Sequence, residues 1–256
     1  MRETRTLMGM PITVEIVGGV GVQEAIDSVF HYFAHVEEVF SVYRSTSEVS
    51  RINKGELSLA EASDEVKEIF ALAEKTKKET GGYFDIINRK GVYDPSGIVK
   101  GWAIHNASKI IIQKGFVNFY VDAGGDIQVG GKNIDGKAWS VGIADPFQSG
   151  PGKYGAIIKV LYIENEGVAT SGTYARGQHI YDPFKKEEKI NDIVSITVVG
   201  PNVYEADRFA TAAFAMGKQG IGLIEKAPGL EAYMIDAEGI AYMTTGFEQY
   251  TFIRKV

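Results

Sequence analysis

Cysteine is absent from this chain of 256 residues. The sequence therefore excludes disulfides, a thiolate nucleophile, a zinc finger and a lipid-modified cysteine. Histidine is scarce as well, with 4 residues in the whole chain. We therefore expect any metal site to use oxygen ligands, which favour Mg²⁺ or Ca²⁺.

Long hydrophobic runs and an excess of positive charge are also missing. No apolar stretch approaches the ~18 residues that a transmembrane segment requires, and residues 1–19 do not form a signal peptide. We expect a cytoplasmic protein as the sequence stands, or a periplasmic or extracytoplasmic one if a leader has been trimmed. The net charge of −6 argues against nucleic acid as a partner, because nucleic-acid binding needs a basic face.

The composition is that of an ordinary globular protein, with 45% hydrophobic and 23% charged residues. Apolar residues at helical spacing predict helices over 22–40, 63–80, 98–113 and 203–216. Between 116 and 200, short β-rich runs alternate with Gly and Asp turns. The sequence therefore predicts an α+β fold over 1–256, as a single domain. Its helices are concentrated in the first half and its mostly antiparallel strands in the second, and two lobes within that domain are the alternative.

Residues 4–17 are predicted to form one strand, interrupted by Met8-Gly9-Met10-Pro11. Because proline cannot donate a hydrogen bond to a neighbouring strand, Pro11 indicates an edge strand or a bulge.

Four glycine-bearing loops stand at predicted element boundaries. They are Met8-Gly9, the segment from Asp94 to Gly101, Asp122-Ala123-Gly124-Gly125-Asp126, and Ala169-Thr170-Ser171-Gly172. Gly97 lies near a predicted helix start, where free N–H groups can face a phosphate. None of the loops matches a dinucleotide-binding or P-loop motif. Tight turns, with Ser96 capping a helix, are the structural alternative.

Asp207 and Thr211 lie four residues apart in an otherwise apolar helix, so both project from one face. A carboxylate and a hydroxyl placed together suit a hard cation. The alternative is that Asp207 caps the helix or pairs with Arg208, while Thr211 bonds back to a main-chain carbonyl.

His179 precedes Ile180-Tyr181-Asp182-Pro183 and could serve as a general base near neutral pH. A lone histidine is more often structural. The aromatic residues Tyr43, Tyr83 and Phe84 could stack on a planar ligand or simply cover the rim of the core.

Taken in order, these segments resemble the ApbE family of Mg²⁺-dependent FAD:protein FMN transferases. The landmarks that carry the resemblance are Met8-Gly9, Phe40 to Arg44, Ser47-Glu48, Arg51 to Asn53, Gly81 to Asp85, Asp94 to Gly101, Gly124 to Asp126, Ala169 to Gly172, His179 to Pro183 and Ala206 to Thr211.

The resemblance implies an enzyme that moves FMN from FAD onto a Thr or Ser hydroxyl of an acceptor flavoprotein and releases AMP. It implies that Asp207, Thr211 and the main-chain carbonyl of Gly97 hold Mg²⁺, and that His179 is the catalytic base. The residues that it places around FAD are Met8, Tyr43, Tyr83, Phe84, Asp85, Asp94, Lys100 and Tyr181.

The sequence departs from the family pattern at three places. Only residues 86–93 separate Asp85 from Asp94, where the family carries a longer insertion. Asp122 stands where asparagine is common, and Pro183 is followed by Phe184 rather than Thr-Gly. The alternatives are an FAD pyrophosphatase that yields FMN and AMP, and a flavin-binding protein without catalysis.

Overall fold

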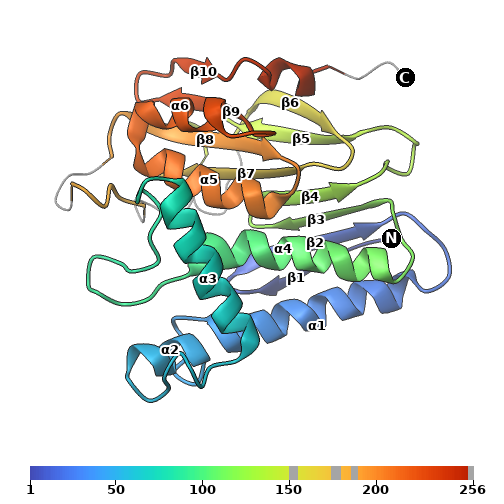
Figure 1. The fold of residues 1–256 in the computed structure, drawn as a ribbon. Coiled ribbons are helices and arrows are strands. Elements are labelled where there is room, and N and C mark those ends of the chain that lie inside the picture. Colours follow the sequence, from blue (N-terminus) through green and yellow to red (C-terminus); the bar gives the residue numbers. More distant parts are fainter. Residues whose placement is uncertain (150–154, 174–179, 186–189, 253–256) are drawn as a thin grey trace.

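An antiparallel sheet of eight strands forms the centre of the protein (Figure 1). The computed structural model describes residues 1–149, 155–173, 180–185 and 190–252. The strand order is β1-β2-β3-β4-β7-β8-β9-β10, and β5 pairs with β6 in a separate hairpin. The strands are β1 (Arg2–Leu7), β2 (Met10–Ile16), β3 (Phe119–Ala123), β4 (Asp126–Gly130), β5 (Trp139–Ala144), β6 (Ile157–Ile163), β7 (Gly167–Gly172), β8 (Ile193–Gly200), β9 (Glu231–Asp236) and β10 (Ala241–Met243).

The helices lie together on one face of this sheet (Figure 1). Their apolar residues recur at helical spacing, so each buries one stripe. Helix α3 shows how its sequence sets its ends: the Ser63 side chain accepts the Val66 N–H at the start, and Lys77 and Lys78 complement the dipole at the end. The helices are α1 (Val22–Phe40), α2 (Glu48–Asn53), α3 (Asp64–Glu79), α4 (Ser96–Gln113), α5 (Val203–Ala215) and α6 (Gly220–Lys226), with 3₁₀ turns η1 (Gly217–Gln219) and η2 (Phe247–Tyr250).

Three apolar clusters hold the layers together. The largest joins α1, α3 and α4 to β2 and β3, and the second joins α5 and α6 to β7, β8 and β9. The third lies between the β5–β6 hairpin, η2 and residues of β4, β7 and β8, so the hairpin covers the other face of the central strands. This arrangement buries β4 on both faces.

The N-terminal segment differs from the single strand predicted over 4–17. It forms a hairpin, in which Met8 and Gly9 adopt positive φ angles of 53° and 72° between the paired residues Leu7 and Met10. Both central residues of a type I′ turn need such angles. The edge or bulge prediction for Pro11 is also wrong, because β2 lies between β1 and β3. Pro11 is tolerated there since β3 pairs only from Ile12 onward, so no N–H is needed at position 11.

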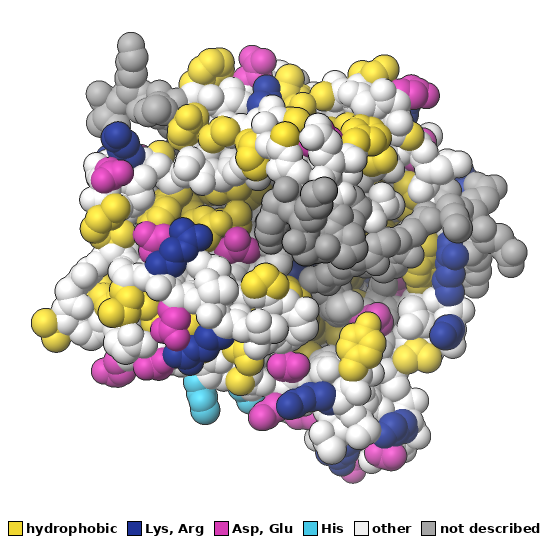
Figure 2. Space-filling view, turned by 180° about the vertical axis from the view of Figure 1, so that it is seen from behind, with side chains coloured by type: hydrophobic (Ala, Val, Ile, Leu, Met, Phe, Trp, Pro, Cys, Tyr) yellow, Lys and Arg dark blue, Asp and Glu magenta, His cyan; other side chains and the backbone are white. Residues whose placement is uncertain are grey.

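The α+β class predicted from the sequence is confirmed, and every pairing between described strands is antiparallel. No helix within the described part of the chain combines the length and hydrophobicity that a membrane span needs. Seen from behind, hydrophobic side chains gather along the top of the molecule, where β6 and β10 lie (Figure 2). Exposed large apolar residues of these two strands include Ile158, Val160, Tyr242 and Met243.

Candidate functional site

A cavity of about 550 Å³ opens where the β1–β2 turn, the loop after α1, the loop between α3 and α4, and the start of α4 meet. Most of the site residues expected from the sequence come together here. Those that line the cavity are Met8, Tyr43, Tyr83, Phe84, Asp85, Asp94, Gly97, Lys100, Tyr181 and Thr211. Asp207 lies behind the wall, and His179 falls outside the described residues.

The β1–β2 turn and the loop after α1 form one side of the cavity. The Met8 N–H donates to Glu37 Oε2 of α1 at 3.1 Å, which fixes the turn against that helix. A non-glycine residue at positive φ carries strain, and such residues cluster at functional sites. Tyr43, which also lines the cavity, is 96% exposed, so its ring is free to contact a ligand.

The loop after α3 supplies an aromatic wall. Phe84 is buried, and its N–H donates to Thr80 Oγ1 at 3.1 Å. The Asp85 carboxylate accepts a hydrogen bond from Lys77 Nζ at 2.7 Å. Tyr83 packs edge-on against Phe184, with ring centroids 4.9 Å apart. The residues expected to contact a flavin are therefore held by Lys77 of α3, by Thr80 at its C-cap and by Phe184.

Asp94 organises the start of α4. Its Oδ1 atom accepts the Ser96 N–H at 3.2 Å and the Ser96 hydroxyl at 2.6 Å. Pro95 is the N-cap residue, so the alternative in which Ser96 caps this helix is wrong. The first turn of an 18-residue helix therefore faces the cavity at Ser96 and Gly97, and since Asp94 takes the Ser96 N–H, the Gly97 N–H is the donor that this turn offers to negative charge.

Helices α4 and α5 cross in close contact at Gly101. A Cβ atom added there would lie 2.7 Å from Asp207 Cβ and 2.9 Å from the Val203 carbonyl oxygen. The Gly101 N–H donates to Asp207 Oδ2 at 2.8 Å. In a regular α-helix this N–H donates to the carbonyl of Gly97, four residues earlier. Because this N–H serves Asp207, we count the Gly97 carbonyl oxygen among the candidate metal ligands beside that carboxylate.

Two buried carboxylates share one ammonium group next to this crossing. Lys100 Nζ lies 2.5 Å from Asp126 Oδ2 and 3.8 Å from Asp207 Oδ1. The other oxygen of Asp126 accepts the Thr170 N–H at 3.1 Å. Burial raises the pKa of Asp207 to about 7, while Lys100 opposes the shift and Asp126 adds to it. A second positive charge brought to this carboxylate would therefore be strongly favoured.

The residues at the base of the cavity fit a hard cation. Gly97 packs against Thr211, whose Oγ1 atom would lie 3.8 Å from a Cβ at Gly97. The Asp207 carboxylate, the Thr211 hydroxyl and the Gly97 carbonyl give an oxygen donor set, which Mg²⁺ prefers. Among the described residues no three His, Asp or Glu side chains gather as a metal site, so main-chain and hydroxyl oxygens would have to contribute.

Asp207 and Arg208 do not pair, so that structural alternative is wrong. Arg208 instead binds Glu79 of α3 and Glu205 of its own helix. Neighbouring residues of a helix project about 100° apart and do not face each other.

Two residues of the site were not expected from the sequence. Asp126 belongs to the Gly124-Gly125-Asp126 loop, where the glycines drew attention to the turn rather than to the carboxylate. Glu37 lies within the amphipathic helix α1, and nothing in its local sequence signals a role at the cavity.

The profile of the ApbE family matches residues 8–92 and 87–234 of this chain. The FAD:protein FMN transferase of Escherichia coli (strain K12) is 30% identical over 159 residues, which are 59% of this chain and 44% of that protein. The enzyme of the same name from Chlamydia muridarum is 25% identical over 249 residues and 74% of each chain. The aligned part spans somewhat less than half the length of the Escherichia coli protein.

Solved structures share the fold over nearly the whole chain. The flavin transferase ApbE from Vibrio cholerae superposes with a TM-score of 0.83, at 20% identity and 98% coverage of both chains. The ApbE protein from Thermotoga maritima gives a TM-score of 0.84 at 19% identity. Together with the family profile, which extends over most of the sequence, these similarities show that the chain belongs to the ApbE family.

Proposed function

We propose that residues 1–256 act as a single flavin transferase domain, which moves FMN from FAD onto a Thr or Ser hydroxyl of an acceptor protein and releases AMP. The observation that carries this proposal is the cavity itself. Its lining combines aromatic and methionine side chains, such as Tyr43, Tyr83 and Met8, with Lys100, Gly97 and Thr211. The relatives of the chain are named FAD:protein FMN transferase. FAD has an apolar flavin ring and a charged pyrophosphate, and the lining of the cavity has apolar and charged residues to match.

The two parts of the cavity suit the two parts of the substrate. The volume of about 550 Å³ lies in the range of small-molecule sites. Met8, Tyr43 and Tyr83 offer flat or polarisable surfaces for the isoalloxazine ring. The Gly97 N–H at the start of α4 offers a hydrogen-bond donor for the pyrophosphate, and Lys100 offers positive charge.

Asp207, Thr211 and the Gly97 carbonyl would hold Mg²⁺. A bound Mg²⁺ supplies Lewis-acid stabilisation of the charge that develops on the pyrophosphate oxygens. The protein's own contribution is to position these groups, because phosphoryl transfer depends chiefly on alignment and charge neutralisation. Lys100 adds a fixed positive charge that Asp126 keeps at the cavity wall.

His179 is proposed as the base that activates the acceptor. It immediately precedes Ile180 and Tyr181, which both line the cavity. The acceptor hydroxyl oxygen bonds to the phosphorus of the FMN half, and the bond from that phosphorus to the bridging oxygen breaks. AMP leaves with the bridging oxygen, and the hydroxyl proton passes to His179. Such a base contributes typically about 10²- to 10⁴-fold in rate.

Mass spectrometry of a mixture of the protein, FAD, Mg²⁺ and a candidate acceptor domain tests the proposal. We expect the acceptor to gain the mass of an FMN phosphoester and AMP to appear, with both products lost in Asp207→Ala. Free FMN and AMP with an unmodified acceptor would instead favour the FAD pyrophosphatase. FAD that binds and stays intact would refute catalysis and leave a flavin-binding protein.

A further inference from the structure

We propose that Arg208 is a positioning residue that ties the helix carrying Asp207 to the aromatic wall of the flavin cavity. This inference rests on the proposed function, because it concerns the same cavity. The Arg208 side chain itself does not line the cavity. Its effect would pass through the C-terminal end of α3 and Thr80 to Phe84.

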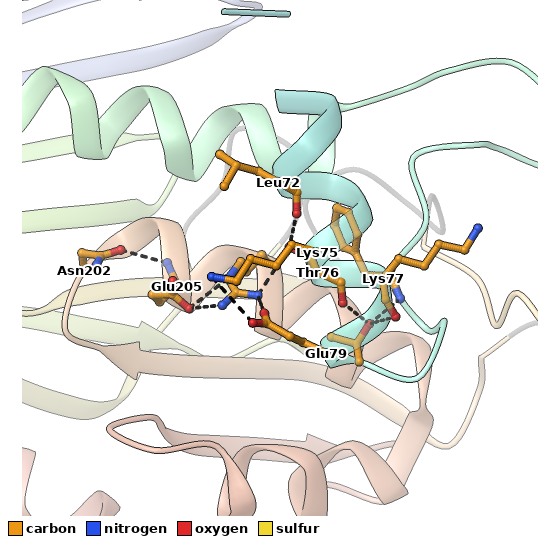
Figure 3. A network of polar contacts seen from close by, with 10 residues as sticks. Leu72, Lys75, Thr76, Lys77, Glu79, Asn202 and Glu205 are labelled. Carbon is orange, nitrogen blue, oxygen red and sulfur yellow. Dashed lines mark hydrogen bonds and ion pairs between the residues drawn. The ribbon is translucent and has the colours of Figure 1, made fainter. Parts of the chain in front are cut away.

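The first link joins α5 to α3. Arg208 is 4% exposed, although arginine is almost never buried unless it is paired. Its guanidinium binds the carboxylates of Glu205 and Glu79, and Nη1 donates to Thr76 Oγ1 at 3.3 Å. Figure 3 shows Thr76 and Glu79 of α3 and Glu205 of α5 converging on this contact. The planar guanidinium can make all of these bonds at once, which a lysine ammonium cannot do in the same geometry.

The second link joins α3 to the cavity wall. Thr80, which is 3% exposed, donates its hydroxyl to the Thr76 carbonyl oxygen at 2.8 Å. The same oxygen atom of Thr80 accepts the Phe84 N–H at 3.1 Å. Phe84 in turn lines the cavity and lies against Gly97, 3.6 Å from where a Cβ would stand. Arg208, Thr76, Thr80 and Phe84 therefore form one continuous chain of contacts.

This chain has a consequence for ligand binding. The loop of residues 81–95 carries the flavin wall but has little regular structure of its own. Its position relative to Asp207 therefore depends on how firmly α3 is attached to α5. If the attachment is loosened, the aromatic wall loses its fixed position relative to Asp207. Part of the binding free energy of FAD is then used to reorder the wall, so the affinity falls.

The test measures FAD affinity by quenching of flavin fluorescence, without metal and without acceptor, so that no turnover contributes. Arg208→Met removes the guanidinium, while Glu79 and Glu205, at 36% and 25% side-chain exposure, can still be hydrated. Thr80→Val removes only the hydroxyl that bridges α3 to Phe84. We expect each substitution to raise the FAD dissociation constant roughly tenfold, the scale of one lost positioning hydrogen bond.

Matched variants separate positioning from stability. Thr80→Ser keeps the hydroxyl and should restore wild-type affinity. Val141→Ala truncates a buried residue of β5 in the third apolar cluster, away from the cavity. It should lower the melting temperature and leave FAD affinity unchanged. The double variant of Arg208→Met and Thr80→Val should bind FAD no more weakly than the weaker single variant, because both break one chain of contacts.

Three results would overturn the inference. One is an FAD affinity of Arg208→Met within twofold of wild type. Another is weaker FAD binding in Arg208→Met together with wild-type FAD binding in Thr80→Val, since the effect would then not pass through Thr80. The third is full additivity in the double variant. A wild-type protein that binds no FAD would refute the proposed function itself, which is a different outcome.

Discussion

Replacing Asp207 by asparagine should make the metal-free protein more stable while it abolishes metal binding. Asparagine keeps an oxygen for the Gly101 N–H and removes a carboxylate that burial opposes. Lys100 would then neutralise only one carboxylate, that of Asp126, whose Oδ2 atom already lies 2.5 Å from Lys100 Nζ. The substitution thus removes a buried charge without leaving its partners unpaired.

The size of the effect follows from the pKa of Asp207. Burial raises it from 3.8 to about 7, and each pKa unit corresponds to about 1.4 kcal/mol. For an acid whose pKa is raised by folding, the loss of folding stability is absent below the pKa of the unfolded state. It is complete above the pKa of the folded state. Wild type should therefore match Asp207→Asn near pH 4 and be less stable by about 4 kcal/mol at pH 8, or roughly 10 °C in melting temperature.

Thermal denaturation in chelator, repeated across this pH range and then with Mg²⁺, measures both effects. Mg²⁺ at about 100 times its dissociation constant should stabilise wild type by about 2.7 kcal/mol and leave Asp207→Asn unchanged. An asparagine variant no more stable than wild type at pH 8 in chelator would refute the reasoning. Equal stabilisation of both proteins by Mg²⁺ would refute Asp207 as a ligand.

Three further substitutions probe separate parts of the site and fold. Lys100→Met leaves Asp126 and Asp207 buried without their shared cation, so urea denaturation should show a loss of about 3–5 kcal/mol, part of which Asp126→Asn in the same chain recovers. Met8→Gly relieves the positive φ angle and should raise the melting temperature by a few degrees, whereas flavin fluorescence should report weaker FAD binding. His105, whose pKa burial lowers from 6.5 to about 4, favours the neutral form in the fold. Unfolding free energy should therefore fall by about 1–2 kcal/mol between pH 6.5 and 4, after allowance for its partial exposure, and His105→Gln should remove that slope.

The helices were predictable because their signal is local. The apolar spacing predicted a helix over 22–40, and α1 spans those residues. The β1–β2 hairpin was missed because its turn is Met8-Gly9 rather than the Asn-Gly or Asp-Gly that usually marks such turns. Methionine adopts the left-handed conformation here with its N–H held by Glu37, a contact between distant parts of the sequence.

The site was predictable only as far as its motifs extend. Asp207 and Thr211 follow from helical spacing, and the cavity residues follow from the order of the family's segments. The ion pair between Lys100 and Asp126 could not be predicted from the sequence, because it joins helix α4 to strand β4, which are separated in the chain by β3 and a turn. The partners of Arg208 needed the structure too: the sequence offered only its neighbour Asp207 as an alternative partner, whereas Arg208 pairs with Glu79 of α3 and Glu205 of α5.

The pairing of β2 with β3 sets the order in which this protein can fold. Ile16 pairs with Phe119, so all of α1 to α4 lies between two neighbouring strands. The helices can form early from local contacts, but closing so long a loop is slow. The Met8 turn is held to α1 through Glu37, and Lys100 of α4 is paired with Asp126 of β4, so the cavity is complete only when the helices have met the sheet. A flavin ligand would therefore have no complete cavity to bind until a late step of folding, and would act by stabilising the finished protein rather than by guiding the chain.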